Sequence, residues 1–129
     1  LQAMNTGHDG SLSTGHANST EDMLSRLETM VLQGSAGLPL DAIRSQIASA
    51  VDIIIHLGRL RDKSRKVLEI AEVTGLEDGE ILLNPLYVFE ETGMENGKIL
   101  GSLQKKNPLS DTRKLLTAGY GSLDGKEQI

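Results

Sequence analysis

The chain has 129 residues, which is enough for one domain with a hydrophobic core. Its 13 Lys and Arg residues against 18 Asp and Glu residues give a net charge of −5, which argues against nucleic acid or an anionic membrane as the main partner. The absence of cysteine excludes disulfides and thiolate metal sites. No run approaches the roughly 20 apolar residues that span a bilayer, so we expect no direct membrane insertion.

The first predicted element is a short strand over residues 11–14, where small residues between glycines suit close approach to a ligand. A helix follows. Its start is marked by a capping box made either by Asn18 with Glu21 or by Ser19 with Asp22. Apolar residues recur at helical spacing behind this start and form one face: Met23, Leu24, Leu27, Met30 and Val31.

A second helix is predicted to begin at Pro39, whose fixed φ suits a first helical turn. Its apolar stripe consists of Leu40, Ile43, Ile47 and Val51. The spacing then changes to a continuous β-branched run at residues 53–55, as expected of a strand covered on both faces. With a polar turn and a return strand at residues 67–73, residues 52–74 are predicted to form a β-hairpin.

More strands are predicted at residues 81–83 and 86–89. Asn84-Pro85 separates them, so this strand is broken, bulged or at an edge. Asn96-Gly97 is a hairpin signal, with residues 98–103 as the partner strand. A short helix over residues 111–118 ends at Gly119, and we expect residues 121–129 to be a disordered tail.

The order of strand, helix, helix and several strands predicts an α/β protein. We interpret it as half of a nucleotide-binding α/β fold with a small antiparallel extension, not a complete doubly wound sheet. Half of such a sheet leaves apolar residues along its edge. We therefore expect the isolated chain to associate with itself or to cover that edge with residues 81–103.

The two histidines near the start are the first candidates for chemistry. If residues 10–15 form a core strand, His16 lies at the strand's C-terminal end, where ligands bind in open α/β sheets. Asn18 and Ser19 would then stand beside the same crevice. An imidazole there can donate a hydrogen bond to a phosphate oxygen or orient water. Spacing alone favours the other interpretation, in which His16 caps a loop and His8 is a surface residue.

A zinc site made of Asp9 and the three histidines, His8, His16 and His56, is possible by residue type. No pair among them has the i, i+4 spacing of a helical metal motif, so we predict no metal site. His56 lies in an apolar strand, where a satisfied core histidine is the more common case.

Basic residues gather at the predicted end of the 52–74 hairpin: Arg59, Arg61, Lys63, Arg65 and Lys66. They could contact an acidic surface of a neighbouring subunit, or nucleotide bound at a subunit boundary. A solvated turn is the simpler interpretation, because hairpin ends commonly carry charge. The sequence contains no Gly-x-x-x-x-Gly-Lys-Ser/Thr, so the loop that cradles phosphates is absent from it.

Two motifs carry a family resemblance: Thr6-Gly7-His8 and Thr14-Gly15-His16-Ala17-Asn18-Ser19, the second of which runs into the capped helix. They resemble the histidine box of the secretion and pilus-assembly traffic ATPases, the type II/IV secretion system ATPases. The sequence is most similar to the branch that assembles tight-adherence (Flp) pili. Segments typical of that branch follow in order at residues 25–30, 38–40, 43–52 and 70–73.

This resemblance implies the C-terminal part of a RecA-like P-loop ATPase domain over residues 1–91, with a hairpin and helix extension over residues 92–120. It implies catalytic roles for His16 and His8 and positions near the nucleotide for Thr14, Asn18 and Ser19. ATP and Mg²⁺ would be bound mainly by residues upstream of Leu1. The resemblance also implies Arg59, Arg61 and Arg65 as candidates for a subunit interface.

The same resemblance implies a cytoplasmic homo-hexamer that docks on an inner-membrane platform protein and powers pilus assembly or protein secretion. The isolated chain is expected to be inactive, since it lacks the phosphate loop and the acidic Mg²⁺ motif. Two alternatives stay open at this point. One is a non-catalytic interaction module whose residues 52–103 dock a partner and whose histidines are structural, and the other is a small metalloprotein.

Overall fold

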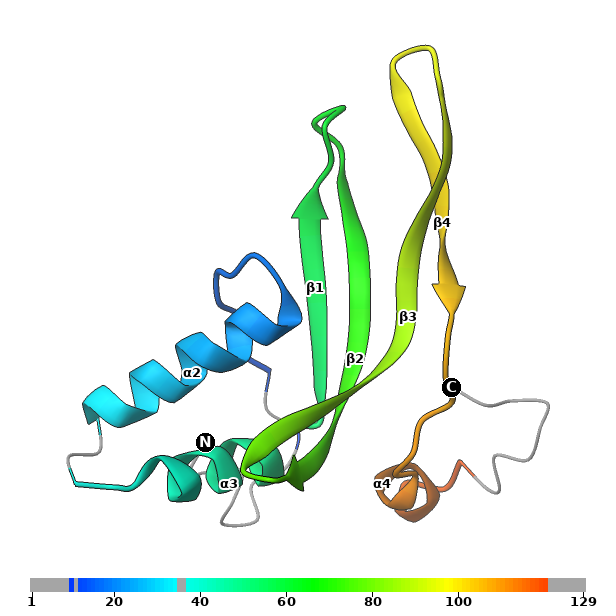
Figure 1. The fold of residues 1–129 in the computed structure, drawn as a ribbon. Helices are drawn as coiled ribbons and strands as arrows, with labels where there is room; N and C mark the ends of the chain where they lie inside the picture. Colours follow the sequence, from blue (N-terminus) through cyan, green and yellow to red (C-terminus); the bar gives the residue numbers. More distant parts are fainter. Residues whose placement is uncertain (1–9, 11, 35–36, 121–129) are drawn as a thin grey trace.

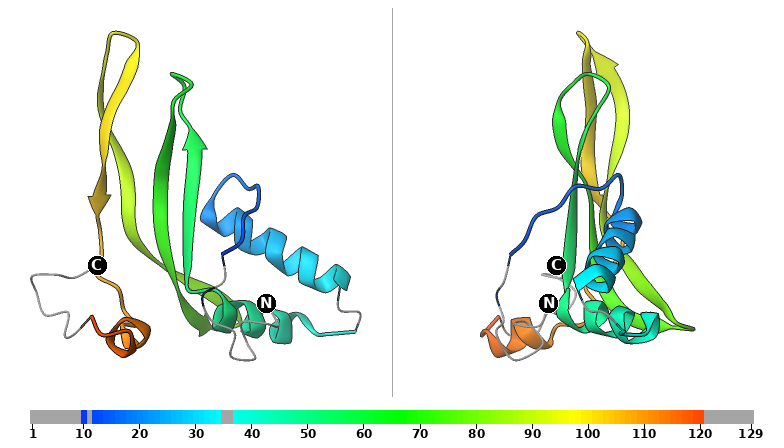
Figure 2. Two further views of the ribbon diagram at one scale, coloured as in Figure 1. Left: turned by 180° about the vertical axis from the view of Figure 1, so that it is seen from behind. Right: turned by 90° about the vertical axis from the view of Figure 1, so that its left-hand side faces the viewer.

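The computed structural model of the chain describes residue 10, residues 12–34 and residues 37–120. Two helices precede four strands and a short final helix (Figure 1). Their bounds are α2 Thr20–Gly34, α3 Leu40–Ala50, β1 Ile53–Arg59, β2 Arg65–Glu77, β3 Glu80–Glu95, β4 Lys98–Lys105 and α4 Arg113–Thr117. Helices α2 and α3 lie on one side of the sheet and α4 lies on the other (Figure 2).

The four strands form one sheet in the order β1-β2-β3-β4, and every neighbouring pair is antiparallel. The predicted 52–74 hairpin and the Asn96-Gly97 hairpin are both confirmed. At the β2–β3 turn, Asp78 and Gly79 have φ values of 53° and 79°, and at the β3–β4 turn Asn96 and Gly97 have 52° and 75°. Two successive residues at positive φ define the two-residue turn that matches the twist of antiparallel strands.

Strand β3 runs without a break through Asn84-Pro85. Of the three predicted alternatives, a broken strand, a bulge or an edge position, the structure confirms the bulge. Ile70 pairs with Tyr87 while the next residue of β2 pairs with Pro85, which leaves Leu86 as the extra residue. On its other side, β3 pairs with β4 only from Tyr87 onward. Pro85 therefore has a strand partner on the β2 side alone. The strand also continues through residues 91 and 92, where the sequence predicted a domain boundary.

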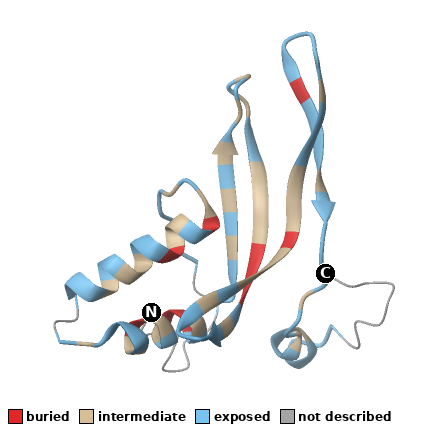
Figure 3. Ribbon diagram, viewed as in Figure 1, coloured by how far each residue is buried: buried red, intermediate tan, exposed pale blue. Residues whose placement is uncertain are grey.

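The core lies where the helices meet the sheet (Figure 3). Leu24 of α2 packs with Ile43 and Ile47 of α3, and the two isoleucines are fully buried. Partly buried residues of the sheet cover this cluster, among them Ile54 and Leu83. The apolar helix stripes predicted from the sequence therefore do form the core, although Met30 and Leu40 lie largely in solvent.

The strand predicted over residues 11–14 is wrong for the part that the structure describes. Residue 10 and residues 12–17 have no regular secondary structure, and Leu12 is fully exposed. A strand needs a neighbouring strand to satisfy its N–H and C=O groups. The described sheet ends at β1, and no described segment pairs with the free edge of β1.

The prediction that residues 53–55 are covered on both faces is also wrong. Exposure alternates along β1, and Ile53, Ile55 and Leu57 are 40%, 54% and 65% exposed. The cause is the position of β1 at the edge of a sheet whose helices α2 and α3 share one face. Residues 81–103 do not cover this edge, because β3 and β4 lie on the far side of β2.

A buried carboxylate on β2 holds the C-terminal segment against the sheet. Glu72 is 3% exposed and accepts hydrogen bonds from Asn84 Nδ2 (3.0 Å), Ser110 N and Oγ (both 2.9 Å) and Asp111 N (3.0 Å). We call this cluster the Glu72 clasp. Burial raises the pKa of Glu72, but the hydrogen bonds from Asn84, Ser110 and Asp111 outweigh it and leave the pKa below its ordinary value.

Further contacts continue the clasp along the sheet. Asn84 Nδ2 donates to the Pro108 carbonyl at 3.1 Å, and Asn107 Nδ2 donates to the Pro85 carbonyl at 2.8 Å. Beyond the clasp, Lys114 of α4 pairs with Asp52 beside β1 at 2.8 Å. The predicted terminal helix is confirmed as α4, yet none of its residues is buried. Polar contacts therefore position this helix.

Glu72→Gln should lower the free energy of unfolding by about 2 kcal/mol, because one acceptor oxygen becomes a donor and a buried N–H loses its partner. Urea denaturation measures the change. Hydrogen exchange should show lost protection at the Ser110 and Asp111 amides. Glu77→Gln, at the exposed end of the same strand, is the control. Unchanged stability and protection in Glu72→Gln would show that the clasp does not hold the segment.

Candidate functional site

The candidate site is the segment that leads into α2, residues 12–19. Thr14, His16 and Asn18 are exposed, and Ser19 is partly buried. The segment folds back on the helix at Gly15, where a Cβ atom would stand 2.7 Å from Met23 Cε. Glycine therefore permits this close approach, since a larger side chain would push the Met23 side chain away. The described part of the histidine box, residues 14–19, is thus held beside the first turn of α2 (Figure 1).

The start of α2 is capped by its own residues. Ser19 Oγ accepts the Asp22 N–H at 3.0 Å, and Asp22 Oδ2 accepts the Asn18 N–H at 2.9 Å. Of the two predicted capping boxes, the structure thus selects Ser19 with Asp22. The Asn18 N–H keeps the pKa of Asp22 below its usual value, with Arg26 contributing. The cap fixes the backbone at residues 18 and 19 to the helix.

The structure brings Thr14, His16, Asn18 and Ser19 together at one helix end. It does so through an irregular segment and a helix cap, not through the core strand that the sequence predicted. His16 makes no hydrogen bond or ion pair with any residue of the described ranges. His8 and Asp9 lie outside the described residues. The proposed phosphate contact of His16 and His8 stays a prediction.

Sequence reasoning missed the anchor next to this segment. Thr20 is 1% exposed, and its Oγ1 lies 2.6 Å from Glu69 Oε1 on β2 and 3.1 Å from Glu21 Oε2. Glu69 shares a strand face with the buried residues Ala71 and Val73. The sequence does contain a signal for this anchor. A glutamate at every-second-residue spacing from apolar residues lies on the covered face of a strand, where its carboxylate needs a hydrogen-bond donor from the elements that cover it.

His56 lies next to this anchor in the sheet. It pairs in register with Glu69, and its side chain is partly buried. His56 therefore lies on the covered face of β1, as expected of a core histidine, but it is only partly buried. Among the described residues, no group of three or more His, Cys, Asp or Glu side chains is arranged so that it could hold a metal ion.

The basic residues gather at the β1–β2 turn, as predicted. Arg59 and Arg65 face one another in register, and the Arg59 Nε–H donates to the Lys63 carbonyl at 3.4 Å. Arg61 is engaged differently, since its guanidinium makes a two-point contact with Glu91 of β3. Of the three arginines predicted at a subunit interface, only Arg61 therefore has a carboxylate partner within the described part of the chain.

Asp62 joins this turn to β4, the strand at the opposite edge of the sheet. Its Oδ2 accepts the Ile99 N–H of β4 at 2.8 Å, and its Oδ1 accepts the Ser64 N–H at 2.9 Å and the Ser64 hydroxyl at 2.5 Å. The Ile99 N–H is the largest cause that lowers the pKa of Asp62 to about 2, followed by the Ser64 groups. The basic turn is therefore a fixed feature of the surface.

With this geometry in place, the class of the protein follows from the comparison with protein families. The type II/IV secretion system protein family matches residues 1–101. The match includes the capped helix pair, the β1–β2 hairpin, β3 and the first part of β4. The chain belongs to this family. Among the described residues, no helix is both long enough and apolar enough to span a membrane.

Three curated relatives are named as conjugal transfer or type IV secretion proteins. A putative conjugal transfer protein of Mycobacterium tuberculosis is 41% identical over 71 residues, which is 55% of this chain and 20% of that protein. The conjugal transfer protein TrbB of Rhizobium radiobacter is 36% identical over 75 residues, 58% of this chain and 22% of that protein. The type IV secretion system protein PtlH of Bordetella pertussis is 35% identical over 80 residues, 59% of this chain and 24% of that protein.

The matched region thus spans about a fifth to a quarter of the length of these relatives. The family that the sequence resembles is confirmed. Assignment to the Flp pilus branch stays a prediction, as these relatives are conjugal transfer and type IV secretion proteins.

Thr20→Val should lower the free energy of unfolding by about 1–2 kcal/mol, because the Glu69 carboxylate would remain against the helix but lose the hydroxyl that donates to it. Valine preserves the shape of the side chain, so the change isolates the hydrogen bond. Thr20→Ser retains the hydroxyl and should lose less stability. Urea denaturation compares the three proteins, and unchanged stability in Thr20→Val would show that the hydrogen bond to Glu69 does not contribute.

Asp62 should make folding sensitive to acid. Its folded pKa of about 2 lies below the ordinary value of 3.8, so the ionised form favours the folded state. This contribution is fully present above about pH 4 and is lost as the pH falls toward about 2. Asp62→Asn should therefore flatten the fall in stability over this range, measured by urea denaturation at constant ionic strength. Parallel curves for the two proteins would contradict the assignment.

Proposed function

We propose that this chain is the C-terminal part of a RecA-like ATPase domain in a motor that hydrolyses ATP to power type II/IV secretion or pilus assembly. The observation that carries the proposal is the family match over residues 1–101, which includes both Thr-Gly-His triplets. The sequence lacks a phosphate-binding loop, and the matched part spans about a fifth to a quarter of its relatives. Both facts support a division of the nucleotide site between this chain and further residues.

The edge of the sheet supports the same division. Ile53, Ile55 and Leu57 form an exposed apolar strip on the edge strand β1. An unpaired, apolar edge strand is a surface that proteins normally cover or blunt. We propose that the remainder of the ATPase domain packs over this strip and pairs with the free edge of β1, which would extend the sheet into the complete nucleotide-binding domain.

Within the proposed motor, His16 would donate a hydrogen bond from its imidazole to the terminal phosphate or orient the attacking water, and His8 would lie near the same phosphate. Thr14, Asn18 and Ser19 would flank the nucleotide. The Ser19–Asp22 cap supports a mechanical role, because it joins residues 18 and 19 to α2. ATP and Mg²⁺ would be held mainly by residues outside this chain, and the isolated chain would be inactive.

The proposed assembly is a cytoplasmic homo-hexamer docked on an inner-membrane platform protein. Arg59, Arg61 and Arg65 are the proposed subunit contacts. Arg59 and Arg65 suit this role best, because Arg61 is already paired with Glu91. The relatives support a place in a secretion or conjugation machine, since they are named as conjugal transfer and type IV secretion proteins.

The decisive test replaces His16 in the full-length protein that contains this chain. His16→Ala should lower ATP turnover by about tenfold or more, since positioned acid–base and hydrogen-bonding groups contribute at least this much. Phosphate release measures turnover, and export of the transported protein measures coupling. Gln33→Ala, at the exposed far end of α2, is the matched control. Normal hydrolysis and normal export in His16→Ala would refute the role of His16.

A second candidate is a non-catalytic interaction module. One observation favours it: β1–β4 form a continuous sheet, and among the described helices only the short α4 lies on the face opposite α2 and α3 (Figure 2). In that case the full-length protein would bind a partner through residues 52–103. It would show no ATP turnover, so His16→Ala would change none.

A further inference from the structure

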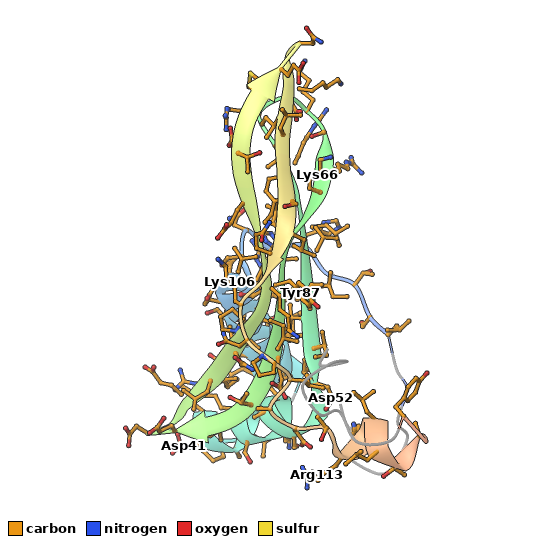
Figure 4. The ribbon with its side chains drawn as sticks, turned by 90° about the vertical axis from the view of Figure 1, so that its right-hand side faces the viewer. Asp41, Asp52, Lys66, Tyr87, Lys106 and Arg113 are labelled. Carbon is orange, nitrogen blue, oxygen red and sulfur yellow. The ribbon has the colours of Figure 1, made fainter. Side chains whose placement is uncertain are left out.

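Strand β2 joins two turns of opposite charge. At its start lie Arg59, Lys63, Arg65 and Lys66, which we call the basic tip. At its end lie Glu77, Asp78 and Glu80, with Asp41 of α3 beside them, which we call the acidic tip. All eight side chains are exposed. Figure 4 shows Lys66 and Asp41 toward opposite ends of the molecule.

The positive charge of the basic tip is not neutralised by the described residues. Of the nearby carboxylates, Glu91 pairs with Arg61, and Asp62 places one negative charge against the four positive charges of the tip. Arg59 and Arg65 stand directly opposite each other, an arrangement of like charges that disfavours strand pairing. The Asp62 contacts hold the turn in place despite this repulsion, so the two guanidinium groups are presented together.

The acidic tip mirrors this arrangement. Glu77 and Glu80 face one another across the Asp78-Gly79 turn, and Asp41 Oδ1 lies 3.9 Å from the position of a Gly79 Cβ. The nearest cation is Arg44, whose NH1 donates to the Gly79 carbonyl at 2.9 Å. Its charge is matched by Glu28, which accepts from Arg44 Nε at 2.9 Å. The four carboxylates therefore remain an unmatched negative surface within the described chain.

The two tips of one chain are too far apart to neutralise each other. Strand β2 has 13 residues, and at about 3.3 Å per residue it separates them by roughly 40 Å. This is several times the screening length of about 8 Å at physiological salt. The described residues therefore match neither tip, and a second copy of this chain carries the complementary charge for each.

We propose that the basic tip of one copy binds the acidic tip of the next, in a repeating head-to-tail contact. Such a heterologous contact closes into a ring when the rotation between copies permits, and otherwise extends as a filament. The inference deepens the proposed function, because it assigns Arg59 and Arg65 a partner surface on the neighbouring subunit of a motor. The contact itself does not depend on nucleotide.

The test exchanges charge between the tips in the full-length protein. Arg59→Glu with Arg65→Glu cancels the net charge of the basic tip, and Glu77→Lys with Glu80→Lys cancels the net charge of the acidic tip. Each variant alone should lose self-association by at least about tenfold at low salt, since one of the two complementary charges is removed. An equimolar mixture should regain association, because opposite tips meet again between the two variants. Sedimentation velocity at low and high salt measures both effects.

Recovery in the mixture separates a specific contact from misfolding, because damaged proteins would not complement each other. Thr117→Glu, an exposed charge change on α4, is the control and should self-associate like the unaltered protein. Failure of the mixture to associate overturns the proposal. So does unchanged self-association accompanied by lost binding of MgATP or of anionic vesicles, which would assign the basic tip to those partners.

ATP turnover, followed in the same samples, keeps this proposal distinct from the proposed function. Charge-dependent pairing in a protein without ATP turnover would refute the motor and leave the head-to-tail contact standing.

Discussion

The arrangement of this chain depends on a carboxylate that is buried and fully hydrogen bonded. Glu72 accepts from a neighbouring strand and from two consecutive residues near the C-terminus, so one side chain joins β2, β3 and the segment that carries α4. Burying a carboxylate is costly unless such donors surround it. Because α4 itself buries no residue, these donors and the Lys114–Asp52 pair determine where the C-terminal segment crosses the sheet.

Strand β2 carries a second carboxylate on its other face. Glu69 receives the Thr20 hydroxyl and so ties the start of α2 to the sheet, while Glu72 ties the C-terminal segment. Two residues of one strand, pointing to opposite faces, therefore position the segments at both ends of the described chain. The turns at the two ends of the same strand carry opposite charge. Strand β2 thus contacts the candidate site and the C-terminal segment, and it has a charged tip at each end.

Local signals predicted the elements, and long-range pairing decided where the predictions failed. Asn96-Gly97, Ser19 with Asp22 and Pro85 each constrain their own backbone, so the turn, the cap and the bulge could be predicted. Whether residues 53–55 are covered depends on which faces the helices choose, and a strand at residues 11–14 depends on a pairing partner. The Thr20–Glu69 and Glu72–Ser110 contacts join residues 49 and 38 positions apart, a separation at which no local pattern points to the partner.

The geometry gives the proposed motor a physical route between its nucleotide and its neighbours. The cap joins residues 18 and 19 to α2, and Thr20 joins the first turn of α2 to Glu69 on β2. From Glu69 the strand leads in one direction to Arg65 and in the other to Glu77. A shift of the histidine box that moved the start of α2 would therefore also displace β2, the strand that has a charged tip at each end. On this view the Thr20 hydroxyl, and not the exposed imidazole alone, connects the proposed nucleotide site with the proposed subunit contact.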